Sequence, residues 1–352
     1  MSRRWVVPPL LAVAAVASVL TAAPASARAP ADDPTWVKVS MVNVTSVRKT
    51  VLGWTPARFK AARVAEAVPV KKVRHPEFPT GKPHEIGKVK GKPPKVTGVP
   101  KTVGRVFFTR GGRDYTCAAT SVSGAEQSLV MTAGHCVYDV VGRAAVKSLV
   151  FVPGYRRGEA PYGVYAGKTG YVWNHFTQHG DFDFDVAFVT VHDGLKRDGD
   201  AWEDAGTLGE VVGGQGFTWS QKDAQVFAAF GYGTRQTPGY CAGPSKTTAP
   251  QRRYGVNNQI GIPCKLSDQA IGGPFILKYD AAKKMGYVNG VVSLVVTADG
   301  TRYLSSPYFA YWVYVLYANA GGKIVEQSTS PSAVSSPAVS GSPATGGSRA
   351  HR

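Results

Sequence analysis

Long apolar runs and closely spaced cysteines are what this sequence has least of. After residue 27, no apolar stretch reaches the length of a membrane span. The chain contains four cysteines, and no two of them are spaced like the ligands of a zinc knuckle. No segment repeats at the period of a solenoid or a propeller. These absences argue against a stable membrane span, a zinc site and a repeat architecture, and we expect neither a metal nor another cofactor.

Acidic residues are also scarce. The sequence has 41 Lys and Arg against 23 Asp and Glu, a formal net charge of +18, and about +12 of it lies between Arg28 and Arg105. Such a basic arm can hold an anionic cell-envelope polymer, a membrane surface or nucleic acid. Aromatic side chains that would stack on bases are nearly absent from its densest part, which argues against specific nucleic-acid binding. We favour a solvated connector over a polyanion-binding arm.

The first 27 residues have the three parts of a secretory signal peptide. Arg3 and Arg4 are followed by an apolar run from Leu10 to Ala23, and the small residues Ala25-Ser26-Ala27 precede Arg28. An N-terminal membrane anchor is the alternative, but the run is near the short limit for a span and a cleavage triplet follows it. We therefore expect a secreted, extracellular protein. In that oxidising compartment the four cysteines would form two disulfides, for which the sequence alone allows three pairings.

The rest of the chain divides by composition into three parts. Residues 28–104 are rich in Pro and Lys and read as a basic linker, with one helix that begins at Thr55 and Pro56 and continues to Ala67. Residues 105–322 contain short apolar runs between Gly, Asn, Asp and Pro clusters, which predicts an all-β domain. Residues 323–352 are rich in Ser, Pro and Ala and are expected to be disordered. Strands are expected at 106–108, 129–132, 149–152, 185–191, 226–230 and 287–296, and a closing helix at 308–320.

One segment of the predicted β domain carries a chemical motif. Cys117 is followed by Met131-Thr132-Ala133-Gly134-His135-Cys136, and here the sequence resembles the trypsin/chymotrypsin-like serine proteases, above all their secreted bacterial members. The resemblance implies two antiparallel six-stranded β-barrels with a C-terminal helix, and a pro-region before residue 105. It implies the disulfides Cys117–Cys136 and Cys241–Cys264, and it makes His135 the general base of a catalytic triad.

The resemblance extends to an aspartate that leads an apolar strand. Asp185, before Val186-Ala187-Phe188-Val189, has the place of the carboxylate that orients the catalytic imidazole, and Asp183 is its rival. Asp181, Asp183 and Asp185 alternate with phenylalanines, so in a strand they would share one face. A calcium site on these three carboxylates is conceivable, and a solvated acidic edge is the favoured alternative.

The third family motif is altered. The nucleophile loop of the family reads Gly-x-Ser-Gly-Gly-Pro, and this chain has Gln269-Ala270-Ile271-Gly272-Gly273-Pro274. Ile271 stands in the serine place and has no hydroxyl for His135 to deprotonate. The backbone N–H groups of Gln269 and Ile271 would form the oxyanion hole, and Gln269 in the glycine place puts its geometry in doubt. Ser267 lies too far upstream to substitute, and Ser293 resembles a structural serine of the substrate-pocket strand.

These residues favour a secreted protease homologue that is catalytically inactive and binds a protein or peptide ligand. An active secreted serine endopeptidase, hydrolysing peptide bonds, is the first alternative, and residue 271 discriminates the two because acyl transfer needs a nucleophile. A polyanion or cell-envelope binding protein is the second alternative, which a steep salt dependence of binding would mark.

Overall fold

The computed structural model describes residues 36–70, 86–248 and 251–323. The expected signal peptide, most of the expected tail and part of the Pro- and Lys-rich segment lie outside these ranges. The described residues are mostly strands joined by short turns, and none of their helices is long and apolar enough to cross a membrane.

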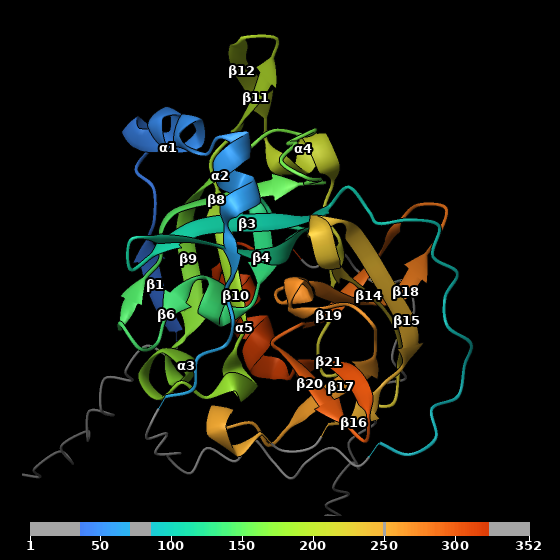
Figure 1. Ribbon diagram of the computed structural model, residues 1–352. Helices are drawn as coiled ribbons and strands as arrows, with labels where there is room; N and C mark the ends of the chain where they lie inside the picture. The colour runs from blue at the N-terminus through green and yellow to red at the C-terminus, as the bar shows by residue number, and fades with distance from the viewer. Residues whose placement is uncertain (1–35, 71–85, 249–250, 324–352) are drawn as a thin grey trace, which may run out of the picture. The chain divides into compact units, whose positions relative to one another are not determined.

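Six antiparallel strands in the first half of the chain close into a barrel (Figure 1). The order is β9-β10-β5-β4-β3-β8, and β8 pairs back onto β9. The apolar runs that predict strands form its walls, because both faces of each strand are covered there. The strands are β3 (Val103–Arg110), β4 (Arg113–Val122), β5 (Leu129–Thr132), β8 (Lys147–Pro153), β9 (Tyr165–Trp173) and β10 (Ala187–Val191).

The second half differs from the second six-stranded barrel that we expected. It contains a five-stranded sheet, β13-β19-β18-β14-β15, and a four-stranded sheet, β16-β17-β21-β20. Two features interrupt the backbone hydrogen bonding between these sheets. The N–H of Val291 donates to the Ser306 hydroxyl (2.9 Å) instead of to a backbone carbonyl. Three strands end at prolines, which have no N–H to donate: Pro244, Pro263 and Pro307. The strands are β13 (Gly216–Phe217), β14 (Val226–Tyr232), β15 (Pro238–Pro244), β16 (Lys246–Thr247), β17 (Gln259–Pro263), β18 (Pro274–Asp280), β19 (Met285–Val291), β20 (Leu294–Ala298) and β21 (Thr301–Pro307).

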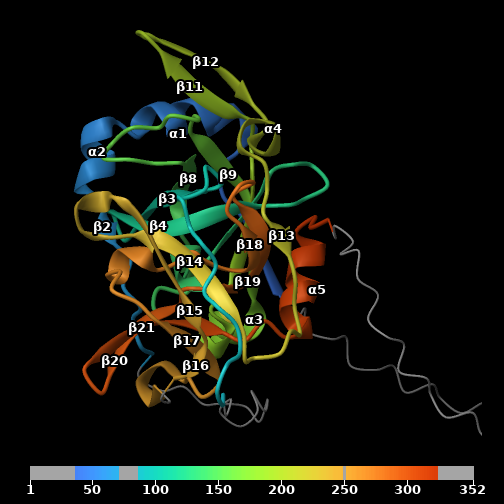
Figure 2. The ribbon, with the colours of Figure 1, turned by 90° about the vertical axis from the view of Figure 1, so that its right-hand side faces the viewer.

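The closing helix packs on the first barrel. Figure 2 shows this helix, α5 (Tyr311–Asn319), beside β13. The Tyr317 ring of this helix stacks on Phe217 with 4.0 Å between centroids and lies 5.5 Å from Phe188 of β10, so one aromatic cluster joins the two halves. The remaining described elements are α1 (Val47–Gly53), α2 (Pro56–Ala61), α3 (Asn174–His179), α4 (Leu208–Val212), β1 (Trp36–Ser40), β2 (Arg63–Val64), β6 (Tyr138–Asp139), β7 (Ala144–Ala145), the hairpin β11 (Gly194–Asp198) and β12 (Ala201–Gly206), and the 3-10 turns η1 (Val44–Ser46), η2 (Gly134–Cys136), η3 (Phe182–Phe184), η4 (Thr234–Gln236), η5 (Arg252–Tyr254) and η6 (Asp268–Ala270).

Residues 36–65 of the arm before Arg105 lie against the barrel, whereas Lys88, Lys90, Lys92 and Lys95 farther along the arm are exposed. Strand β1 pairs antiparallel with β9, and Trp54 and Phe59 are buried against Phe107 of β3. Arg58 of α2 forms a two-pronged ion pair with Asp114 (2.6 and 2.7 Å) and lies over the Trp54 ring. For residues 36–65 the expectation of a solvated connector is wrong, because it counted the cations and gave too little weight to the aromatic residues between them.

The expected helix is shorter than the sequence pattern suggested. The Thr55 hydroxyl caps it by accepting from the Arg58 N–H (3.2 Å), as the Thr-Pro signal predicts. The helix ends at Ala61, and Ala62 is already extended. Residues 63–64 then form strand β2, which pairs in parallel with β4.

Replacing Trp54 tests this packing. Its indole is 1% exposed and donates to the Ser148 carbonyl (2.9 Å), so Trp54→Ala should cost about 3–5 kcal/mol of folding free energy and lower Tm by about 10 °C. Val44→Ala, at a side chain that is 71% exposed, is the control and should change Tm by a degree or two at most. Equal thermal melting of the two variants would contradict the packed arm.

Candidate active site

His135 lies on the short turn η2, directly after β5. The Cys117–Cys136 disulfide ties this turn to β4 across 19 residues, and a cross-link of that loop length restricts the unfolded chain by about 3 kcal/mol. Gly134 leaves little room for a side chain: a Cβ there would lie 3.0 Å from the Asp185 carboxylate and 3.2 Å from the Phe176 ring. The second disulfide joins Cys241 to Cys264, so the structure contains both pairs that the resemblance implies.

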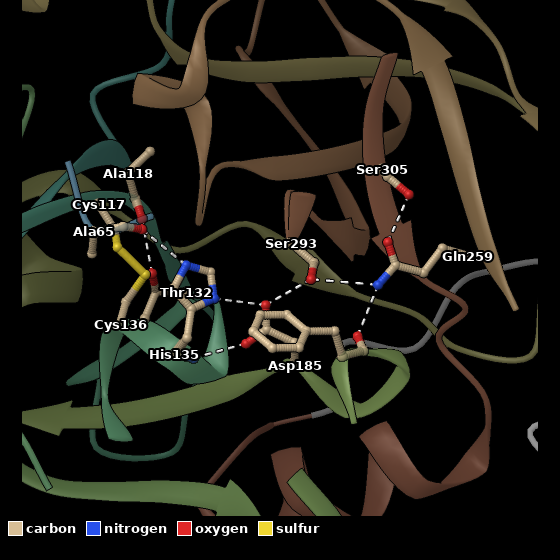
Figure 3. A network of polar contacts seen from close by, with 11 residues as sticks. Ala65, Cys117, Ala118, Thr132, His135, Cys136, Asp185, Gln259, Ser293 and Ser305 are labelled. Atoms are coloured by element: carbon tan, nitrogen blue, oxygen red, sulfur yellow. Dashed lines mark hydrogen bonds and ion pairs between the residues drawn. A yellow bond between two sulfur atoms is a disulfide. The ribbon is translucent and has the colours of Figure 1, made fainter. Parts of the chain in front are cut away.

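Asp185 is fully buried and accepts three hydrogen bonds. Its Oδ1 accepts from the His135 backbone N–H (2.7 Å), and its Oδ2 faces His135 Nδ1 (2.8 Å) and accepts from the Ser293 hydroxyl (2.6 Å; Figure 3). A buried carboxylate is stable only when such donors replace its water shell. The arrangement fixes the orientation of the imidazole ring.

The other two aspartates of this segment face elsewhere, which corrects the expectation of one shared strand face. Residues 182–184 form a 3-10 turn instead of a strand, because the Asp181 carboxylate accepts from the Asp183 N–H (2.9 Å) and caps it. Asp181 also lies 3.3 Å from His175 Nε2, and Asp183 accepts from the N–H groups of Asn257 and Asn258. The three carboxylates thus have separate partners and do not form the calcium cluster that we considered.

A buried polar chain continues behind Asp185 (Figure 3). Ser293 receives a long hydrogen bond from the Gln259 amide (3.4 Å), whose oxygen accepts from Ser305 (2.6 Å). Ser293 is fully buried and faces Asp185, so it supports the carboxylate instead of lining the neighbouring cavity. Gln259 and Ser305 were not predicted, because single polar residues in short strands carry no local signal of such a network.

The backbone of the loop that contains Ile271 is constrained at Gly272. Gly272 has a φ of +86°, and a Cβ there would lie 2.1 Å from the Ala118 carbonyl. The Ala118 N–H donates to the Ile271 carbonyl (2.7 Å), which fixes the loop on β4. Ile271 itself is 4% exposed and lines a cavity of about 410 Å³ together with residues 294–297.

The two N–H groups expected to form an oxyanion hole are used within this loop. The Ile271 N–H donates to the Asp268 carbonyl (3.0 Å), and the Gln269 N–H faces the Ser267 hydroxyl (3.4 Å). These bonds belong to the 3-10 turn η6, which Ser267 caps. An oxyanion hole requires both N–H groups to point at one oxygen of the substrate, so it is not formed in this conformation.

The side chain of Gln269 is held from inside the protein. Its amide oxygen accepts from the guanidinium of Arg105, which is fully buried on β3 without a carboxylate partner among the described residues. The guanidinium lies 4.3 Å from the centre of the Tyr232 ring and also donates to the Thr116 hydroxyl (3.2 Å). Burial lowers the pKa of Arg105 to about 10, so it remains a cation at neutral pH. Sequence reasoning missed this contact, which joins residues 164 positions apart.

The second imidazole nitrogen of His135 faces the backbone of the N-terminal arm. Its Nε2 lies 3.1 Å from the Ala65 carbonyl oxygen, within hydrogen-bond distance. The backbone of the arm thus occupies the place beside Nε2 that the hydroxyl of a nucleophile needs for proton transfer. The sequence contains no pattern that places Ala65 at this histidine.

Comparison with known proteins supports the architecture. No protein-family model matches the chain, and no curated protein is significantly similar to it in sequence. Among solved structures, it is similar to the protease Anisep from Arthrobacter nicotinovorans, with 29% identity, a TM-score of 0.54, and a match covering 64% of this chain and 97% of that one. The serine protease AL20, a thermostable enzyme from an extremophilic microorganism, gives 28% identity, 63% and 97% coverage, and a TM-score of 0.53.

The fold is that of the chymotrypsin-like serine proteases. The similarity is to bacterial members, as the motif around His135 suggested. On this fold His135 and Asp185 have the geometry of the base and its orienting carboxylate. The position that the resemblance gives to the nucleophile holds Ile271.

The buried Asp185 carboxylate provides a test of the site that is independent of catalysis. In Asp185→Asn, an NH₂ group replaces one acceptor oxygen and faces donors, so we expect a loss of about 3–5 kcal/mol in unfolding free energy, measured by urea denaturation. Ser293→Ala removes one donor and should cost about 1–2 kcal/mol. Asp200→Asn, at a fully exposed carboxylate, is the matched control. Equal stability of Asp185→Asn and this control would contradict the network.

Proposed function

We propose that this protein is a secreted, catalytically inactive homologue of bacterial serine proteases whose cleft binds a protein or peptide ligand. The observation that carries the proposal is Ile271 in the nucleophile place, in register with Gly272, Gly273 and Pro274. A hydrocarbon side chain cannot form an acyl-enzyme. Loss of a triad nucleophile removes on the order of a millionfold in turnover, and the remaining His–Asp pair cannot replace it.

Two further features support inactivity. The N–H groups of Gln269 and Ile271 are bonded inside the turn η6, so a substrate carbonyl would find no paired donors. His135 Nε2 is bonded to the Ala65 carbonyl and faces no hydroxyl among its hydrogen-bond partners in the described residues. Nucleophile, base and oxyanion hole are therefore all outside their catalytic states.

An extracellular location is part of the proposal. Two disulfides link all four cysteines, and such bonds persist in oxidising compartments. The sequence signature of residues 1–27 and the similarity to bacterial proteases support the same location. The ligand would be an extended peptide or a protein segment, because the cavity beside Ile271 is lined by β20, an edge strand of its sheet, and extended peptides bind by pairing with such edges.

A fluorophosphonate probe, which labels activated serines covalently, tests the inactive state. We expect no labelling of the secreted wild-type protein, little labelling of Ile271→Ser, and more labelling of Ile271→Ser with Gln269→Gly, because nucleophile and oxyanion hole act together. Gln269→Gly alone is the control and should remain unlabelled. Wild-type labelling that disappears on substitution of a single serine would contradict the proposal of an inactive homologue. Equal labelling of Ile271→Ser and of the double variant would contradict the joint action of nucleophile and oxyanion hole.

A further inference from the structure

The residues after helix α2 add a short strand to the edge of β4. Along β4, strand β5 pairs only with Thr120, Ser121 and Val122, which leaves the edge at residues 115–116 open on that side. Strand β2 fills this edge in parallel, with Val64 opposite Thr116, and the Ala65 N–H donates to the Thr116 carbonyl (3.0 Å). Pairing of an extended segment with an open sheet edge is a general mode of peptide recognition.

The same segment then crosses His135. Ala65 is fully buried and its carbonyl oxygen accepts from His135 Nε2 (3.1 Å), as Figure 3 shows. The next residues, Glu66 and Ala67, line the cavity of about 410 Å³ beside Ile271 and β20. Within six residues the chain thus contacts the β4 edge, the histidine and the cavity next to the nucleophile loop.

The side chains of this segment suit a covered cleft. Ala62 and Ala65 are buried and Val64 is half-buried, whereas Arg63 and Glu66 are exposed. A small side chain is required at residue 65, since the histidine ring and the strand edge leave no exposed surface around it.

We propose that residues 62–67 are a tethered ligand of the cleft, so that an extended peptide with a small residue opposite His135 must displace this segment in order to bind. The inference rests on the proposed peptide-binding function and adds its regulation. Tethering gives the segment an effective concentration of about millimolar, so a free peptide of equal affinity would compete poorly until the segment is released.

Two release variants and one matched control test the proposal in the full chain. Ala65→Tyr introduces a ring that the buried position cannot hold, and Ala65→Pro removes the N–H that donates to Thr116 while adding far less bulk than tyrosine. Val68→Tyr adds the same ring at a side chain that is 43% exposed and should leave the segment in place. The probe is a fluorescein-labelled peptide with the sequence of residues 61–70, and its binding is followed by fluorescence anisotropy.

A second readout reports on the histidine itself. Diethyl pyrocarbonate acylates accessible imidazole nitrogens, and peptide mapping by mass spectrometry resolves His135 from the other histidines. We expect His135 to be protected in the wild-type and Val68→Tyr proteins and acylated in both release variants. The labelled peptide should bind the release variants at least about tenfold more tightly than the wild type.

The two readouts separate the possible failures. Equal acylation of His135 in the wild type and both release variants would overturn the tethered ligand, whatever the peptide does. Acylation restricted to the release variants, without peptide binding to them, would overturn the peptide-binding function and with it the displacement model, while leaving the segment as a cover. Peptide binding and acylation confined to the release variants would support both.

Discussion

The carboxylate of Asp185 is the group on which the arrangement of this site depends. It lies in the interior, and its charge is stable there only because His135 and Ser293 supply donors to both oxygens. These partners come from the turn after β5 and from the connection between β19 and β20, so both halves of the chain converge on one buried anion. Removing the carboxylate would leave His135 and Ser293 without their shared acceptor, so the whole network depends on it.

The loop around Ile271 keeps a tightly constrained backbone although it carries no nucleophile. Its glycines are required by contact with the backbone of β4 and of β14: a Cβ at Gly273 would lie 2.0 Å from the Phe230 carbonyl. These demands are steric and hold whatever side chain occupies position 271. The Gln269 side chain also accepts a hydrogen bond from the buried guanidinium of Arg105. This contact favours the turn η6, in which the Ile271 N–H is already bonded to the Asp268 carbonyl. Architecture and chemistry are therefore separable in this fold.

Local patterns predicted much of the first barrel and of the site. The run at 129–132 coincides with β5, and the cysteine and Gly-His-Cys spacing pointed to His135. The expected strand at 287–296 is two strands, β19 and β20, because Ser293 between them turns inward to Asp185. The arrangement of the second half as two sheets could not be predicted, since it depends on backbone-to-side-chain hydrogen bonds such as that from Val291 to Ser306. The roles of Ala65 and Arg105 could not be predicted for the same reason, because each contacts a residue far away in the sequence. Ala65 and His135, for example, are 70 positions apart.

The proposed function requires that the wild-type protein does not catalyse acyl transfer. The most direct measurement is incubation of the secreted protein with a diverse library of synthetic peptides, followed by mass spectrometry of all new termini, with His135→Ala as the blank. We expect the same termini from both proteins. Peptide bonds cleaved by the wild type and left intact by His135→Ala would contradict the inactive state.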